Sequence, residues 1–186
     1  MNKETENKYL KILQNNSNNL IVDFDNKKEF IKALTNIKNM KLTFGYLVII
    51  NFKVSEFLQS LLGIENDLVL MISKTKVKEI MDKHGVNSEI IFKIIKKTSS
   101  SPEAIVFDSK RNSYQFGIKI DEKNYRAVIE FNVIPKGIKI VKAHILTSLF
   151  KEKRYEKRLE NIKKGNIDNL FLVYEDISSR TAIVIC

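Results

Sequence analysis

From residue 103 onward, apolar and polar side chains alternate over successive runs that are separated by short turns. In the most regular run, Tyr114, Phe116, Ile118 and Ile120 occupy every second position. A period of two is that of a strand with one buried face. Because turns of a few residues cannot carry the chain across a sheet, such runs pair as antiparallel neighbours. The pattern therefore predicts an antiparallel meander, with strands over residues 104–107, 114–120, 125–133 and 138–149.

The part of the chain just before this run has helical spacing. Val77, Ile80, Met81 and His84 fall at positions i, i+3, i+4 and i+7, which is one face of an α-helix. A second helix follows, and it ends before Pro102 because the residue before a proline avoids the helical region. Helices first and strands afterwards predict an α+β fold, in which N-terminal helices pack on a four- to five-stranded antiparallel sheet.

Composition divides the chain into two parts. Residues 1–44 begin as a polar segment rich in Asn and Lys, and we expect a helical arm there that is partly flexible. Residues 45–186 form the expected main α+β domain. Further predicted elements are strands over 20–22, 45–52, 67–72, 170–174 and 182–185, and helices over 30–37, 54–62 and 151–164. Candidate helix caps are Asp25 or Asn26, Ser55, and Asn87 or Ser88.

Basic residues outnumber acidic ones. The chain has 32 Lys and Arg against 22 Asp and Glu, which gives a net charge of +10. Such an excess predicts a polyanionic partner, either nucleic acid or an anionic membrane surface, and disfavours a small cationic substrate. The alternative is a Lys-rich composition in which these side chains only solvate helices.

The positive charge is concentrated between Lys136 and Lys164, where ten basic and three acidic residues give 10 − 3 = +7. A phosphate backbone attracts such a concentration, although a salt-bridged surface helix has the same composition. Candidate nucleic-acid contacts are Lys83, His144, Lys151, Lys153, Arg154, Lys157 and Arg158.

Strict alternation along the strand over residues 138–149 assigns its side chains to two faces. It places Thr147 and Leu149 on one face, and His144 with Lys142 on the other. We therefore expect His144 at the surface or in contact with nucleic acid. The other histidine, His84, ends a helix just before Gly85, and an imidazole is the side chain that changes charge near neutral pH.

Several classes of protein are disfavoured by what the sequence contains. Cys186 is the single cysteine, so a disulfide within the chain is excluded. Two histidines and one cysteine leave no convincing zinc constellation, and we expect neither a metal nor a cofactor. The polar N-terminus resembles neither a signal nor a transit peptide, and the longest apolar run, residues 46–50, is too short to cross a bilayer. A soluble protein is expected.

Three short pieces of the chain carry a resemblance to a known family. They are the Lys83-His84 pair before a turn, the Pro-x-Ala-Ile-Val sequence that begins at Pro102, and the Ile-Leu-Thr-Ser sequence that begins at Ile145. Over about residues 45–176 the chain resembles the phage-encoded nuclease domains of the barnase–EndoU–colicin superfamily, which share the BECR fold. These domains are associated with phage head-morphogenesis proteins and polymorphic toxins.

The resemblance implies a metal-independent endoribonuclease of the toxin or phage-effector type, in which the ribose 2′-hydroxyl attacks the neighbouring phosphorus. The expected substrate is RNA, with tRNA as a candidate, and the expected protein partner is an acidic antitoxin or immunity protein. The implied location is the cytoplasm of the producing or target cell. The motifs carry over onto His84 as general acid or base and onto Thr147 as a hydrogen-bond donor to the phosphate. Arg126 and Lys142 are chosen by charge and position as cations that stabilise the transition state.

Each of these residues also has a simpler interpretation. His84 could be a histidine at the edge of the core, and Thr147 an ordinary strand residue. The catalytic strand Glu of barnase has no equivalent that the sequence identifies, and Glu130, on a middle strand, is the candidate for a second base. The unplaced acid supports the alternative of a non-catalytic nucleic-acid-binding or protein-interaction module on the same fold.

Overall fold

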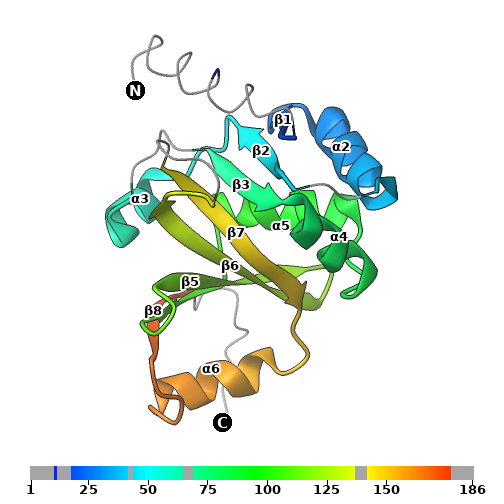
Figure 1. The fold of residues 1–186 in the computed structure, drawn as a ribbon. Coiled ribbons are helices and arrows are strands. Elements are labelled where there is room, and N and C mark those ends of the chain that lie inside the picture. The colour runs from blue at the N-terminus through cyan, green and yellow to red at the C-terminus, as the bar shows by residue number, and fades with distance from the viewer. Residues whose placement is uncertain (1–10, 12–17, 42–43, 65–68, 137–141, 177–186) are drawn as a thin grey trace.

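The computed structural model describes residues 11, 18–41, 44–64, 69–136 and 142–176, and Figure 1 shows how their helices and strands are arranged. In chain order the elements are β1 (Leu20–Asp23), α2 (Lys27–Asn39), β2 (Tyr46–Ile50), α3 (Glu56–Leu62), β3 (Leu70–Ser73), α4 (Lys74–Asp82), α5 (Ser88–Ser100), β4 (Ala104–Asp108), β5 (Ser113–Ile120), β6 (Lys123–Val133), β7 (Ala143–Lys151), α6 (Tyr155–Lys163) and β8 (Leu170–Glu175). The strand predicted over residues 182–185 lies outside the described residues.

The eight strands of the described residues belong to one mixed sheet, in the spatial order β1-β2-β3-β7-β6-β5-β4-β8. The meander is confirmed, because β4, β5, β6 and β7 pair antiparallel with their successive neighbours. In contrast, β1 pairs in parallel with β2, and β3 pairs in parallel with β7.

The α+β class is therefore confirmed, but the expected four- to five-stranded antiparallel sheet with helices only at the N-terminal side is wrong. The helices are interleaved with the strands, and the sheet has eight strands of mixed direction. Short turns reveal pairings between consecutive strands only. Two helices and three strands separate β3 from β7 in the sequence, so no local sequence pattern predicts that these two strands pair.

Side-chain caps begin the helices that build the core. The predicted caps Asn26, Ser55 and Asn87 are confirmed, since the side chain of each accepts a hydrogen bond from an N–H of the first turn. Ser73 caps α4 in the same way. Because α4 starts directly after β3, this cap fixes the point at which the chain leaves the sheet.

The main core lies between one face of the sheet and the helices α2, α4 and α5. Phe30 and Leu34 of α2 are fully buried in it, together with Leu70 of β3 and Phe116 of β5. The segment that we expected to form an arm over residues 1–44 thus contributes, in its described part, the strand β1 and the helix α2 to this sheet and core. Among the described residues, no helix has both the length and the apolar composition needed to cross a bilayer.

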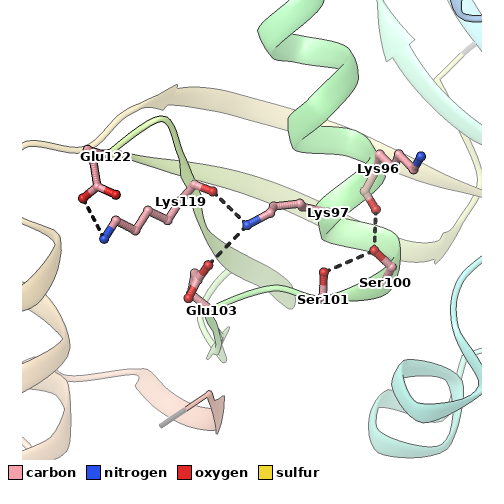
Figure 2. A network of polar contacts seen from close by, with 7 residues as sticks. All are labelled: Lys96, Lys97, Ser100, Ser101, Glu103, Lys119 and Glu122. Carbon is pink, nitrogen blue, oxygen red and sulfur yellow. Dashed lines mark hydrogen bonds and ion pairs between the residues drawn. The ribbon is translucent and has the colours of Figure 1, made fainter. Parts of the chain in front are cut away.

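Polar contacts join the end of α5 to the start of the meander (Figure 2). The Lys97 ammonium donates a hydrogen bond to the Lys119 carbonyl at 2.9 Å and lies 3.4 Å from a carboxylate oxygen of Glu103. The Ser100 hydroxyl donates to the Lys96 carbonyl, one turn earlier in the same helix, at 3.0 Å. These contacts fix the direction in which the chain enters β4.

An extra residue in β7 interrupts its pairing with β6. Val128 pairs with Ser148 and Ile129 pairs with Leu146, so that Thr147 is left between them as a β-bulge. An unpaired extra residue bends the strand and changes the face to which the following side chains point.

Beyond this bulge the two faces of β7 are exchanged. Leu149 is fully buried in the main core, whereas Phe150 pairs with Arg126 and lies on the opposite face of the sheet. The prediction that Thr147 and Leu149 share a face is therefore wrong. It assumed unbroken alternation, and the sequence has no glycine or proline at this point to indicate a bulge.

The helix α6 packs on the face of the sheet opposite to the main core, at the bottom of Figure 1. Its Tyr155 and Leu159 form a separate apolar cluster with Ala104 and Val106 of β4. Tyr155 lies directly over Gly117 of β5, where an added Cβ atom would stand only 2.7 Å from the tyrosine Cζ. Gly117 is therefore required by the close approach of α6.

We predict that Gly117→Ala destabilises the protein by about 1–3 kcal/mol, because the new methyl group overlaps the Tyr155 ring and pushes α6 from the sheet. Urea denaturation measures this loss. In the double variant with Tyr155→Ala the overlap is gone, so the two losses should not add. Additive losses would show that the methyl group does not collide with Tyr155.

Candidate functional site

The face of the sheet opposite to the main core carries an open hollow of about 380 Å³, within the usual size range of ligand sites. Strands β5, β6 and β7 form most of its lining, and Lys76 of α4 and Arg111 of the β4–β5 turn complete it. The polar residues and the one aromatic residue from the strands are Ser113, Gln115, Arg126, Glu130, Thr147, Ser148 and Phe150.

The hollow carries an excess of positive charge. Lys76, Arg111 and Arg126 contribute three cations and Glu130 one carboxylate, so that the balance is 3 − 1 = +2. Hydroxyl groups and the amide of Gln115 add hydrogen-bonding groups to this lining. Cations and donors that converge on an open hollow form a site suited to an anion such as a phosphate group.

Two guanidinium groups meet at the border between this hollow and α6. Arg126 of β6 and Arg158 of α6 both donate hydrogen bonds to the side-chain oxygen of Gln115, the former at 3.1 Å. The carboxylate of Glu152 lies 3.6 Å from Nε of Arg126 and 3.7 Å from Nε of Arg158. The Gln115 amide donates in turn to buried Asp108 at 3.2 Å. One amide and one carboxylate thus hold both cations in place.

Burial lowers the pKa of both guanidinium groups from the ordinary value. For Arg126, the attraction of Glu152 acts against this change and repulsion by Arg111 adds to it. For Arg158, repulsion by Arg126 adds to it and Glu152 opposes it. An arginine guanidinium is not deprotonated in proteins, so both groups stay charged at neutral pH. The hollow therefore keeps the positive charge of Arg126, which lines it.

His84 stands at the rim of the same hollow. It follows α4 and is exposed, and the chain turns at Gly85, which has a φ of 61°. Its ring centroid lies 5.9 Å from that of Phe150, whose ring lines the hollow. The guanidinium carbon of Arg126 lies 4.5 Å from the centroid of that Phe150 ring. The structure thus brings His84 and Arg126 to one aromatic side chain.

Thr147 lies in the hollow as the bulge residue of β7. Its hydroxyl donates a hydrogen bond to the Val128 carbonyl at 3.2 Å. A hydroxyl has one proton to donate, so in this conformation Thr147 supports the bulge rather than offering a donor to a phosphate. The neighbouring hydroxyl residue, Ser148, lines the same hollow.

Two predicted site residues lie elsewhere. Lys142 is exposed and immediately precedes β7, whereas Phe150 is eight residues further along. At about 3.3 Å per strand residue, these two positions are roughly 26 Å apart. His144 is 0 % exposed and packs edge-on against Phe131, with 4.8 Å between the ring centroids. The prediction that His144 lies at the surface is wrong, because His144 shares a face with its register partner Leu70, which belongs to the main core.

The other predicted nucleic-acid contacts differ in exposure. Arg158 is turned toward the sheet by Gln115 and Glu152, and it is mostly buried. The remaining members of that set are exposed: Lys83, Lys151, Lys153, Arg154 and Lys157.

Sequence reasoning missed several side chains that line the hollow, among them Ser113, Gln115 and Phe150. A signal for the first two was present, because they alternate with the apolar positions Tyr114 and Phe116 and so mark a polar face. Phe150 had no such signal, since only the bulge places it on this face.

We predict that Thr147→Val destabilises the protein by about 1 kcal/mol, because the Val128 carbonyl loses its hydroxyl donor at the bulge. The matched variant Thr147→Ser keeps the hydroxyl and should lose clearly less. Urea unfolding of both variants gives the comparison. A larger loss in Thr147→Ser than in Thr147→Val would indicate that the methyl group, not the hydrogen bond, supports the bulge.

Among the described residues, no group of three or more His, Cys, Asp or Glu is placed to hold a metal ion. The hollow offers an imidazole at its rim, a carboxylate, several cations, an amide and the three hydroxyl side chains of Ser113, Thr147 and Ser148. No protein-family model, no curated protein and no solved structure matches this chain.

Proposed function

We propose that the hollow is the active site of a metal-independent endoribonuclease. The observation that carries the proposal is the meeting of His84 and Arg126 at Phe150, beside a lining with net positive charge. Cleavage of RNA through its own 2′-hydroxyl needs a base, an acid and cations around the phosphate. Each kind of group is present in the hollow or at its rim.

The proposed roles follow from the charges of the groups. The carboxylate of Glu130 takes the proton of the 2′-hydroxyl, whose oxygen then forms a bond to phosphorus. His84 gives a proton to the departing 5′-oxygen as the bond between that oxygen and phosphorus breaks. The products are a 2′,3′-cyclic phosphate and a 5′-hydroxyl end. Arg126, with Arg111 and Lys76, balances the negative charge that grows on the phosphate oxygens.

We assign to Ser148 the role predicted for Thr147, which is to donate a hydrogen bond to the phosphate. The Thr147 proton is engaged with the Val128 carbonyl, and Ser148 is the next hydroxyl along the same strand. The exposed cations Lys83, Lys151 and Lys153 flank the segments that carry His84 and Phe150 in the sequence. They suit the phosphates on either side of the scissile bond, and the substrate we propose is RNA, with tRNA as a candidate.

A second candidate function is RNA binding without cleavage. The observation that favours it is the engagement of Arg126 with Glu152 and Gln115, which partly satisfies this cation before any phosphate arrives. A binding module would retain RNA in a salt-sensitive way, with log K falling linearly with log salt concentration, and would leave the RNA intact.

We predict that the purified full chain cleaves total RNA in the presence of EDTA and leaves 2′,3′-cyclic phosphate ends. His84→Ala should lower the cleavage rate by about 10²–10⁴-fold, the usual contribution of a positioned acid or base. Gel analysis of the RNA and end-group analysis of the products measure both effects.

The matched control is Lys28→Ala, which removes an exposed cation from α2, on the helix-covered side of the sheet. It should cleave like the wild type. Intact RNA with the wild-type chain, together with salt-sensitive binding, would reject the nuclease in favour of the binding module. Equal cleavage by His84→Ala would remove His84 from the mechanism.

A further inference from the structure

We infer that Phe150 is a positioning residue, whose ring holds His84 and Arg126 at one place in the hollow; this inference rests on the ribonuclease function proposed above. The ring centroids of His84 and Phe150 are 5.9 Å apart, with 47° between the ring planes. The Arg126 guanidinium lies over the Phe150 ring, 4.5 Å from its centroid. One side chain therefore contacts both groups.

Packing in the core does not account for the place of Phe150. The ring is half-buried and belongs to none of the three apolar clusters formed by the described residues. The bulge at Thr147 turns it onto the polar face, directly opposite Arg126 in the strand register. An aromatic ring usually adds apolar area to a core or an interface. Here the bulge places the ring beside a cation and an imidazole instead.

The two groups that Phe150 contacts come from different parts of the chain. Arg126 belongs to β6 and His84 follows α4, so the local chain does not determine their separation. A guanidinium is attracted to the face of an aromatic ring, which restricts the rotation of its long side chain. His84 is exposed, and contact with the same ring limits the positions that its imidazole can take. A displacement of about 1 Å at a reacting centre can lower a rate by about 10²-fold.

The alternative role for an aromatic ring in such a hollow is stacking on an RNA base. Stacking contributes to substrate binding, so its loss raises KM, whereas the loss of positioning lowers kcat. Arg126 already lies over the ring of Phe150, which favours positioning.

Two variants of the full chain test the inference. Phe150→Leu keeps an apolar side chain and removes the ring, and Phe150→Tyr keeps the ring. We expect Phe150→Leu to lower kcat for RNA cleavage by about 10–100-fold with KM nearly unchanged, and Phe150→Tyr to restore most of kcat. Urea midpoints near that of the wild type show that both variants are folded. Wild-type kcat in Phe150→Leu, or a loss confined to KM, would overturn the inference.

A second measurement does not depend on catalysis. The chain has two histidines, so NMR resolves their ring signals, and His84→Gln identifies the signal of His84. In Phe150→Leu the His84 signal should move as the ring contact is lost, and titration with inorganic phosphate should show weaker binding at Arg126. Phe150→Tyr should restore both. If the wild type does not cleave RNA, the nuclease proposal fails, and this measurement still decides the role of Phe150: an unchanged His84 signal in Phe150→Leu overturns it.

Discussion

The pairing of β6 with β7 around the extra residue Thr147 determines which side chains meet on the open face of the sheet. Before the bulge, Ile145 of β7 stands beside Glu130, and after it Phe150 stands beside Arg126. With unbroken alternation, Leu149 would point into the hollow and Phe150 into the core. The hydrogen bond from the Thr147 hydroxyl to the strand backbone thus supports a local irregularity on which the whole arrangement of cation, ring and imidazole depends.

The electrostatics of the hollow depend on how two buried cations are kept near each other. Arg126 and Arg158 repel one another, and burial away from water is unfavourable for both. Gln115 and Glu152 offset this by accepting hydrogen bonds from, or pairing with, both guanidinium groups. Because Arg158 belongs to α6, the same contacts attach this helix to the sheet. A phosphate that enters the hollow would meet cations whose orientation is already fixed, which is the arrangement that makes charged donors effective.

Much of the local structure could be predicted from the sequence, because its signals are local. Caps such as Asn26 and Asn87, the spacing of Val77 and Ile80, and the alternation from Tyr114 to Ile120 each depend on a few neighbouring residues. The parallel pairing of β3 with β7 and the bulge at Thr147 depend on distant partners and could not be predicted in this way. The unpredicted pairing of β3 with β7 explains why the sheet was expected to be smaller and entirely antiparallel. It also explains why His144 was expected at the surface, although it is buried. His84 was predicted at a helix end and in one site with Thr147 and Arg126. Its contact with Phe150 was not predicted, since that contact depends on both features.

The parallel register of β3 and β7 also has a consequence for the newly made chain. Leu70 and Met71 find their partners, His144 and Ile145, only after more than 70 further residues have been made and have left the ribosome. Until then, the first three strands and their helices have an open sheet edge on the side that β7 later occupies. The lining of the hollow extends in the sequence from Lys76 to Phe150. A nascent chain that ends before Phe150 therefore cannot form it. Translation itself therefore delays the appearance of the finished site until Phe150 has been added to the chain.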